Sequence, residues 1–372
     1  MKKVRFSITN LGGGGAEKIL INILKYLPRD KFQISLFLFE KSGVYLKDIP
    51  NDVELQYFIN PDIFPTSLRS LYYKVIRKAA FRLLMNFPSV VYKICGVKYC
   101  DVDIAYIQDT TYLLKANNAK KKIAWIHCDI KSTPFYELGL ETNLQYADKI
   151  VCVSEDLKSG LCKSYPKYSY KTITIQNPSP LSDIKTQAKI DEFKYKAGMI
   201  ISVGRLTRQK NFDVLIRAIR VLQDKNLNYS LKILGEGADF DQLQELIHQL
   251  NLTEYIELLG FKSNPYRYMN AADVFVLSSR YEGFGQVLVE ALCVGVPVVS
   301  TDCKVGPREV LQDGECGLLV PVGDVEKLAD GIELLMTDIE LREKFVVQGL
   351  KRAQDFDLPK IMTQIEALFD EI

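Results

Sequence analysis

The sequence predicts an α/β protein of two domains, each a doubly wound parallel sheet with helices on its faces. Its 372 residues exceed one ordinary α/β domain and suit two domains of roughly 180 residues each. Strand-like and helix-like segments alternate through both halves at a spacing that favours parallel strands joined by right-handed crossovers. Asn177-Pro178-Ser179-Pro180 is a stiff, turn-forming stretch between the halves and is the predicted linker.

The domain boundaries follow from this linker. We expect an N-terminal domain over 1–178, a C-terminal domain over 179–354 and a C-terminal helix over 355–372 that packs back on the N-terminal domain. Open parallel sheets bind their ligands at the carboxyl ends of the strands. The sequence therefore predicts a substrate cleft between two facing sheets.

A βαβ unit opens the first half. Apolar runs of strand length and one amphipathic helical pattern closed by a proline identify it. The expected strands are 4–9, 33–39, 104–107, 122–125, 149–153 and 172–176, and the expected helix is 15–26.

The second half restarts the same alternation of short apolar strands and amphipathic helices. The expected strands are 199–203, 230–234, 256–259, 274–277 and 296–300. The expected helices are 212–223, 240–250, 264–270, 286–293 and 325–336.

Composition places the chain among folded globular proteins. Apolar residues make up 47% and charged residues 25%, which is enough to fill two cores. No apolar run approaches the roughly 18 residues needed to cross a bilayer, so we expect a cytoplasmic protein. The eight cysteines form no CxxC pair and are interpreted as reduced, buried side chains.

Charge is divided unevenly along the chain. Residues 1–180 carry 26 Lys and Arg against 16 Asp and Glu, whereas 181–372 carry 22 against 30. A basic first half favours a polyanionic partner. No segment matches a nucleic-acid-binding module, so the sequence favours an anionic membrane surface over nucleic acid.

The strongest chemical motif lies after the expected strand 274–277. Glu282 begins a Gly-rich turn, Gly283-Phe284-Gly285, and Glu290 follows eight positions later inside the next helix. Backbone N–H groups at a helix N-terminus suit the oxygens of a ligand, and a carboxylate can accept from two vicinal hydroxyls of a ribose. An exposed turn with two solvated carboxylates is the alternative.

With the following Gly295-Val296-Pro297 and Gly306-Pro307-Arg308 segments, this region resembles the retaining GT-B glycosyltransferases often called family 4, whose E-x7-E signature fits Glu282 and Glu290. The resemblance implies two Rossmann-like domains, the first binding the acceptor and the second the nucleotide-sugar. It extends to Gly204-Arg205 and Lys210, which look like the family's G-R-x4-K segment. Arg and Lys at this spacing can converge on a diphosphate.

The resemblance assigns further residues to the donor site. Backbone contacts to the nucleotide are implied at segments after two other strands, for which ordinary strand-ending turns are the alternative. A mobile glycine loop is implied near the N-terminus. The implied donor-binding residues are Gly14, Gly15, Gly204, Gly235, Gly237, Phe261, Gly283, Phe284, Gly285, Gln286, Val287 and Glu290. The implied catalytic residues are His127, Arg205, Lys210 and Glu282.

His127 lies two residues beyond the expected strand 122–125, in a chain with one other histidine, His248. A histidine at such a position is by default a structural hydrogen-bonding group. The family places a similar His-x-Asp segment against the donor sugar, and Asp129 completes that pattern here. The resemblance therefore implies that His127 orients the sugar.

Two cofactor-binding patterns compete with the glycosyltransferase interpretation. A G-x-G-x-x-G dinucleotide fingerprint counted from Gly12 and Gly14 meets Glu17 where a third glycine is required, although Glu40 ends a strand where a ribose-binding acid would lie. Asp101 and Asp103 match the DxD metal motif formally but are interpreted as the start of a strand. We expect no metal and no cofactor.

The implied reaction is attack of an acceptor hydroxyl on the anomeric carbon of a nucleotide-sugar, most readily a UDP-sugar, with retention of configuration. The enzyme would be of hexosyltransferase type and act in surface-polysaccharide or glycoconjugate synthesis, on a saccharide or lipid-linked saccharide. A GT-B sugar-nucleotide epimerase or phosphorylase, and a sugar-nucleotide-binding protein without turnover, remain alternatives.

A basic, aromatic segment covers 63–100. It holds seven Lys and Arg and no Asp or Glu. Its apolar residues recur at roughly helical spacing, which predicts a basic amphipathic helix that lies on an anionic membrane. Leu68, Tyr72, Val75 and Ala79 are expected on the inner face, and the outer face is expected to carry Arg69, Lys74, Arg77 and Lys78. A core-packing helix with a basic exposed side is the alternative.

Overall fold

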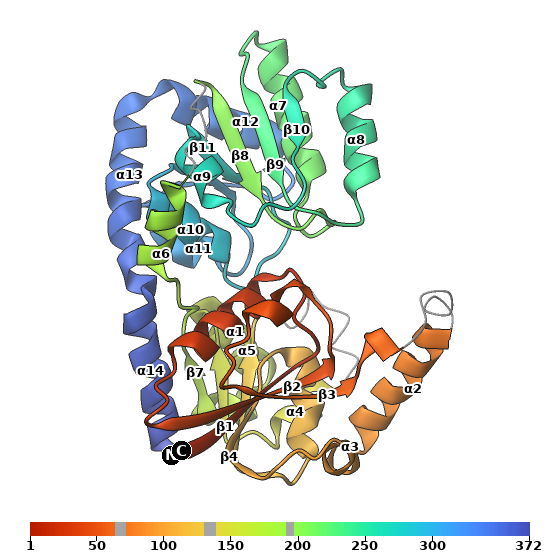
Figure 1. The fold of residues 1–372 in the computed structure, drawn as a ribbon. Helices are drawn as coiled ribbons and strands as arrows, with labels where there is room; N and C mark the ends of the chain where they lie inside the picture. The colour runs from red at the N-terminus through yellow and green to blue at the C-terminus, as the bar shows by residue number, and fades with distance from the viewer. Residues whose placement is uncertain (64–71, 130–138, 191–196) are drawn as a thin grey trace. The chain divides into compact units, whose positions relative to one another are not determined.

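The computed structural model describes residues 1–63, 72–129, 139–190 and 197–372. It divides into two compact units (Figure 1): unit 1 is Met1–Pro178 with Ile361–Ile372, and unit 2 is Ser179–Lys360. Each described unit contains a parallel sheet covered by helices, which confirms the predicted α/β fold class.

Within the described residues of unit 1, the strand order is β3-β2-β1-β4-β5-β6-β7. The strands are β1 (Lys2–Ile8), β2 (Phe32–Glu40), β3 (Glu54–Ile59), β4 (Cys100–Ala105), β5 (Ala119–Ile126), β6 (Lys149–Cys152) and β7 (Thr172–Thr174). The helices are α1 (Gly15–Tyr26), α2 (Tyr72–Asn86), α3 (Pro88–Ile94), α4 (Leu140–Leu144) and α5 (Glu155–Ser164). The strand order reverses between β1 and β4, and loops beyond the carboxyl ends of such a pair form the usual ligand crevice.

Within the described residues of unit 2, the strand order is β10-β9-β8-β11-β12-β13. The strands are β8 (Met199–Val203), β9 (Ser230–Leu234), β10 (Ile256–Leu258), β11 (Val274–Leu277), β12 (Val298–Thr301) and β13 (Leu318–Val320). The helices are α6 (Leu181–Ala188), α7 (Phe212–Asp224), α8 (Phe240–Gln249), α9 (Tyr266–Asn270), α10 (Gln286–Val294), α11 (Pro307–Val310), α12 (Val325–Thr337) and α13 (Ile339–Ala353). Here the order reverses between β8 and β11.

The last helix, α14 (Leu358–Glu371), joins unit 1 through its C-terminal part. Phe369 packs edge to face against Phe6 and Phe32, at centroid separations of 6.2 and 5.7 Å. Aromatic pairs in this geometry stabilise by about 0.5 to 1.5 kcal/mol each beyond the area that they bury. The end of the chain is thus part of the unit 1 core.

Buried side chains on both faces explain the continuous apolar runs of the central strands. Val4 and Phe6 of β1 and Ile200 and Ile201 of β8 are fully buried. A parallel sheet covered by helices on both faces requires this pattern. Among the described residues, no helix combines the length and the apolar character that crossing a membrane demands.

Candidate active site

Two loops of unit 2 meet where its strand order reverses. Loop 204–211 follows β8 and loop 278–285 follows β11. The backbone N–H of Arg280 donates to the carbonyl of Gln209 at 2.8 Å, and the Gln209 amide donates to the carbonyl of Tyr281 at 3.0 Å. These bonds hold the two loops against each other at the expected ligand position of the sheet.

Lys210 and Glu282 form an ion pair across these loops. Lys210 Nζ lies 2.6 Å from Glu282 Oε1, and the two side chains are only 15% and 8% exposed. The Ser279 hydroxyl donates to the same Oε1 at 2.6 Å, and the Ser278 hydroxyl donates to the carbonyl of Lys210 at 2.8 Å. The structure thus brings together two predicted catalytic residues that lie 72 positions apart in the chain.

Both loops lead directly into helix N-termini. Asn211 is the N-cap of α7, with φ 55°, and Gly285 is the N-cap of α10, with φ 88°. Glycine adopts such a left-handed conformation without steric cost. The first N–H groups of a helix have no partner inside the helix and carry a partial positive charge. The site therefore combines a lysine, two helix N-termini and a carboxylate, which suits a diphosphate next to hydroxyl groups.

Arg205 is exposed on the first loop, and glycines shape the backbone beside it. The backbone N–H of Gly204 donates to the carbonyl of Leu234 at 2.9 Å. Gly235 has φ 144°, and a Cβ there would lie 1.8 Å from the Gly204 carbonyl oxygen. A Cβ at Gly237 would lie 2.1 Å from the Leu206 carbonyl oxygen. Both glycines are therefore required for the close approach of the loops after β8 and β9.

Phe261 lies after β10 and is exposed. Its backbone N–H donates to Glu236 Oε1 at 3.4 Å. The contact joins the loop after β10 to the loop after β9, so the glycine-containing segments predicted to contact the nucleotide lie next to each other.

The signature turn is mostly buried. Phe284 packs edge to face against Phe356 at 5.4 Å, so its side chain belongs to the core of unit 2. Gly283 is also buried, and Val287 is half-buried. The Gln286 amide donates to Ser179 Oγ at 2.5 Å. Any ligand contact of Phe284 would therefore come from its backbone.

Glu290 is a buried carboxylate on α10, one helical turn beyond the signature turn. The hydroxyl of Tyr266, on α9, donates to Glu290 Oε1 at 3.1 Å. The sequence motifs singled out Glu290 and not Tyr266, since α9 and α10 come together only in the fold. A Tyr at the start of a helix carries no distinguishing signal in the sequence.

In unit 1, the glycine loop leads into α1. Gly14 is the N-cap of the helix and Gly15 its first residue. The Glu17 carboxylate folds back over Gly14. It lies so close that a Cβ atom on Gly14 would be only 2.2 Å from Glu17 Oε2. A Glu three residues after the N-cap is the position from which a side chain reaches the start of its own helix.

His127 follows β5 and is packed among aromatic rings. Its ring centroid lies 4.7 Å from that of Tyr106, and it stacks on Trp125 at 6.4 Å. Burial lowers the pKa of His127 to about 3, against the opposing effect of a hydrogen bond with the Tyr106 backbone. Among the described residues, Nε2 has no hydrogen-bond partner. The imidazole is therefore neutral at physiological pH.

A half-buried acid precedes His127 in the chain. Burial raises the pKa of the Asp109 carboxyl to about 6, and the charge of Glu17 adds to the effect. Asp109 follows β4, at the strand reversal of unit 1. The sequence motifs did not single out this residue.

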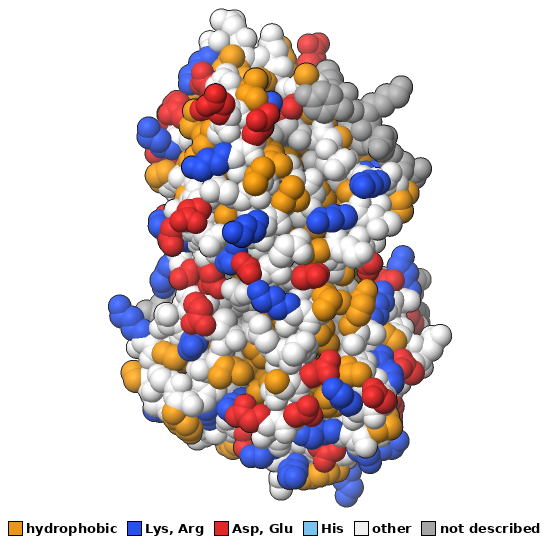
Figure 2. Space-filling model, turned by 90° about the vertical axis from the view of Figure 1, so that its left-hand side faces the viewer, with side chains coloured by type: hydrophobic (Ala, Val, Ile, Leu, Met, Phe, Trp, Pro, Cys, Tyr) orange, Lys and Arg blue, Asp and Glu red, His pale blue; other side chains and the backbone are white. Residues whose placement is uncertain are grey.

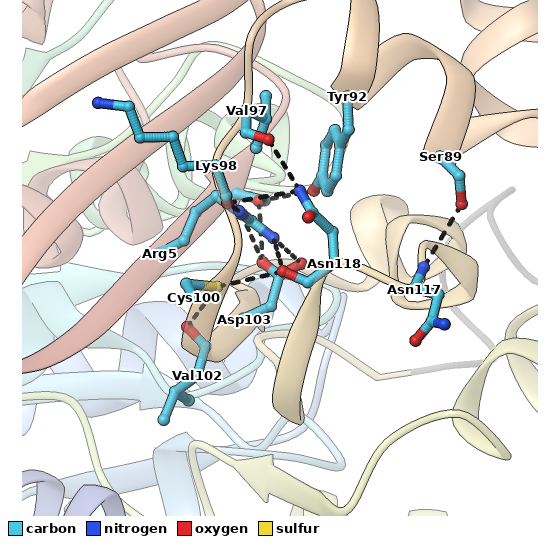
Figure 3. Close-up of polar contacts among 11 residues, drawn as sticks. Arg5, Ser89, Tyr92, Val97, Lys98, Cys100, Val102, Asp103, Asn117 and Asn118 are labelled. Carbon is cyan, nitrogen blue, oxygen red and sulfur yellow. Dashed lines mark hydrogen bonds and ion pairs between the residues drawn. The ribbon is translucent and has the colours of Figure 1, made fainter.

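Both DxD acids belong to the first residues of a strand, as the sequence indicated, but β4 begins at Cys100 and not at the expected residue 104. Asp103 accepts from Arg5 of β1 through both carboxylate oxygens, at 3.1 and 2.7 Å (Figure 3), and both side chains are buried. Asp101 Oδ2 accepts from the backbone N–H of Lys3 at 2.8 Å. Because Arg5 neutralises Asp103, the acid can occupy a buried strand.

The described residues include no group of three or more His, Cys, Asp or Glu arranged to hold a metal ion.

Glu40 is the acid that would bind a ribose if the glycine loop held a dinucleotide. Its carboxylate is paired with Arg77 of α2 at 2.7 Å. The Ser42 hydroxyl donates to its other oxygen at 2.9 Å. The Glu40 carboxylate thus joins β2 to α2.

Helices α2 and α3 correct the predicted amphipathic pattern of 63–100. Leu68 and Arg69 lie outside the described residues, as does the Tyr72 side chain. Val75, expected on the inner face, is 63% exposed, while Leu84 and Tyr92 are buried against β2 and β3. Packing against β2 and β3 decides which side chains of α2 and α3 are buried. The hydrophobic pattern of the sequence alone does not predict that face.

The exposed side of α2 and α3 is both apolar and basic. Ile94 of α3 is 68% exposed. The other exposed large apolar side chains are Val75, Ile76, Leu83, Phe87 and Val90, and the exposed basic ones are Lys74, Arg77, Lys78, Arg82 and Lys93. By contrast, Lys and Arg alternate with Asp and Glu over the face of α13 and α14 drawn in Figure 2. We call the exposed side chains of α2 and α3 the basic apolar surface.

Comparison with known proteins decides the family. The model of "Glycosyl transferases group 1" matches residues 183–352. Over 97% of both chains, the sequence is 31% identical to the N-acetylgalactosamine-N,N'-diacetylbacillosaminyl-diphospho-undecaprenol 4-alpha-N-acetylgalactosaminyltransferase of Campylobacter jejuni. The chain belongs to the group 1 glycosyltransferases. This glycosyltransferase is also 26% identical, over 100% of its own length, to a second Campylobacter jejuni enzyme, a GalNAc-alpha-(1->4)-GalNAc-alpha-(1->3)-diNAcBac-PP-undecaprenol alpha-1,4-N-acetyl-D-galactosaminyltransferase.

Solved structures confirm the GT-B fold of this glycosyltransferase. The Anabaena protein HepE, solved with UDP and glucose, superposes with a TM-score of 0.76 over 100% of both chains, at 20% identity. The Staphylococcus aureus protein TarM gives a TM-score of 0.76 over 99% of this chain and all of its own, at 15% identity. The resemblance inferred from the sequence motifs is therefore confirmed for membership of the group 1 glycosyltransferases and for the GT-B fold.

Proposed function

We propose that this glycosyltransferase moves a sugar from a UDP-sugar to a hydroxyl of a lipid-linked saccharide, with retention of the anomeric configuration. The observation that carries the proposal is the ion pair of Lys210 and Glu282 beside two helix N-termini at the strand reversal of unit 2. Two full-length relatives are named for undecaprenol-linked acceptors. A protein of the same fold was solved with UDP and glucose.

The chemistry requires stabilisation of negative charge. The acceptor oxygen bonds to the anomeric carbon while the bond from that carbon to the diphosphate oxygen breaks, and UDP leaves with the electron pair. Lys210, Arg205 and the N-terminus of α10 would stabilise the diphosphate as this charge develops. Preorganised groups of this kind are typically worth about 3 to 4 kcal/mol each.

The other residues would hold the donor. Glu282 would keep Lys210 in place and accept from hydroxyls of the sugar, and Glu290 would accept from the vicinal hydroxyls of the ribose. His127 would offer a sugar hydroxyl a neutral hydrogen-bond partner. The acceptor proton would pass to an oxygen of the leaving diphosphate, on the face from which that group departs.

Charge neutralisation by these residues takes the place of a divalent cation in the proposal. Glu282 is held by Lys210 and Ser279, and Asp103 is held by Arg5. Carboxylates engaged in this way are poor ligands for a hard cation. We therefore propose that transfer needs no metal.

We further propose that the enzyme works at an anionic membrane through the basic apolar surface. A lipid-linked acceptor is held in a bilayer, and each Lys or Arg near an anionic surface contributes about 1 kcal/mol. Reversing Lys74, Lys78 and Lys93 to Glu should therefore weaken binding to phosphatidylglycerol vesicles by roughly a hundredfold or more.

The control is a triple charge reversal of Lys327, Lys344 and Lys351, which are exposed on α12 and α13 and lie outside the basic apolar surface. Sedimentation with anionic and with neutral phosphatidylcholine vesicles measures the binding. Equal partitioning of the parent protein to both vesicle types, or equal losses in both triple variants, contradicts the proposed surface.

The proposed reaction is tested by a donor and acceptor screen. Thermal shift against nucleotide-sugars should single out UDP-sugars. UDP release from the best donor should then depend on added lipid-linked saccharide. Release without acceptor, or epimerised donor without transfer, would contradict the proposal.

A further inference from the structure

The hydrogen bond between Tyr266 and Glu290 joins two helices at the carboxylate proposed to bind the ribose. Glu290 lies in α10, whose other residues from Leu288 to Cys293 are buried and apolar. A charged group at such a position is costly to bury unless hydrogen bonds satisfy it. The Tyr266 hydroxyl supplies one of these bonds at 3.1 Å, and both residues are buried.

Tyr266 is itself held rigidly. It is the first residue of α9 and follows the N-cap Pro265, whose ring fixes the backbone φ angle. The side chain of Asn264 donates to the carbonyl of Gln187 in α6 at 2.8 Å. α9 therefore presents the tyrosine hydroxyl to α10 from a fixed backbone.

The carboxylate of a glutamate rotates about χ3 with only a weak preference for any one angle. It also has acceptor sites for about four donors, so a bond from Tyr266 is compatible with bonds from two ribose hydroxyls. A fixed donor on Oε1 sets the rotation of the carboxylate plane. Preorganisation of this kind improves binding by reducing the ordering that the ligand must impose.

We propose that Tyr266 is a positioning residue that orients the Glu290 carboxylate for the two hydroxyls of the ribose. This inference rests on the proposed role of Glu290 in nucleotide binding. The hydroxyl of Tyr266 acts through Glu290, so its removal should weaken the binding of the ribose hydroxyls and leave the contacts of the diphosphate unchanged.

The test compares UDP with 2′-deoxy-UDP and 3′-deoxy-UDP by isothermal titration calorimetry. The parent enzyme should bind UDP about tenfold more tightly than either analogue, because a hydrogen bond to a charged group is lost. Tyr266→Phe should reduce that ratio to about threefold or less, mainly by weakening UDP. The thermal unfolding midpoint checks that the variant is folded.

Tyr268→Phe is the matched control. Tyr268 lies on the same helix and is buried, and its hydroxyl accepts from Arg267 at 3.1 Å. Its loss should leave the UDP to deoxy-UDP ratio at the parent value. A merely structural effect of removing a buried hydroxyl would change both variants alike.

The outcomes separate two failures. If the parent enzyme does not distinguish UDP from the deoxy analogues, the ribose role of Glu290 is wrong. If the parent distinguishes them and Tyr266→Phe distinguishes them equally, the positioning role of Tyr266 is wrong. Should Tyr266→Phe fail to fold, Tyr266→His decides, because its shorter side chain cannot place a donor where the tyrosine hydroxyl lies: the ratio should fall in this variant, and an unchanged ratio overturns the inference.

Discussion

The ion pair of Lys210 and Glu282 gives the account its most specific prediction. The two groups are 2.6 Å apart and nearly buried, and Ser279 also donates to Glu282. Replacing Lys210 by Ala leaves a buried carboxylate with a hydroxyl partner and no counter-charge. Breaking a buried pair in this way typically costs about 3 to 5 kcal/mol, and we expect the lower part of that range because Ser279 remains.

The same substitution should also slow transfer. Loss of about 3 to 4 kcal/mol of transition-state stabilisation lowers the turnover number by roughly two to three orders of magnitude. The two losses have different causes, so a second substitution should separate them. Lys210→Ala combined with Glu282→Gln removes the unpaired charge and should recover most of the stability, while turnover stays low.

Urea unfolding and steady-state kinetics on the parent, both single variants and the double variant measure the two effects. Lys210→Ala turnover within about threefold of the parent corresponds to less than about 0.7 kcal/mol and refutes the proposed role of Lys210. Recovery of turnover together with stability in the double variant would also refute it, because Lys210 would then act only through folding.

Four further predictions use the same site and its surroundings. Arg205→Ala should lower turnover by at least tenfold with little change in the unfolding midpoint, since Arg205 is exposed; turnover within threefold of the parent contradicts its role. Glu290→Ala should weaken UDP binding measured by calorimetry, whereas Glu282→Ala should spare UDP binding and depress transfer; equal losses of UDP affinity refute this division. Transfer should persist in excess EDTA, and activity that disappears on chelation and returns with Mg²⁺ would establish a metal requirement. The pKa of His127 is near 3 in the folded protein and near 6.5 in the unfolded chain, so the unfolded chain binds a proton first as pH falls. The free energy of unfolding should therefore decrease as pH falls from about 6.5 toward 3, and His127 should have no effect on it above that range. His127→Gln should reduce this loss in unfolding measurements at pH 7 and pH 5, and an identical pH dependence contradicts a buried neutral imidazole.

The strands of unit 2 could be predicted because their signals are local. β8, β9 and β11 begin and end where the apolar runs indicated, since each run is short and bounded by turn residues. The first residues of β4 were left out of the expected strand 104–107, because a buried Asp103 is costly until its partner Arg5 is known. That partner lies 98 residues away, and only the fold brings it there.

The same limit applies to the site. The motifs predicted Lys210, Glu282 and Glu290 as site residues, but the sequence could not show that the first two form an ion pair. Nor could it reveal Tyr266, whose contact with Glu290 joins two helices. The inner face of α2 was predicted wrongly at Val75 because packing against β2 and β3 selects the buried residues.

The anomeric configuration of the first product tests the central claim most directly. The enzyme would be incubated with an α-linked UDP-sugar identified by the donor screen and a polyprenyl-diphosphate-linked saccharide, and the early product analysed by proton NMR. The account predicts an α-linked product, with one UDP released for each sugar transferred. A β-linked product, or UDP release accompanied only by free sugar, would contradict retaining transfer by this site.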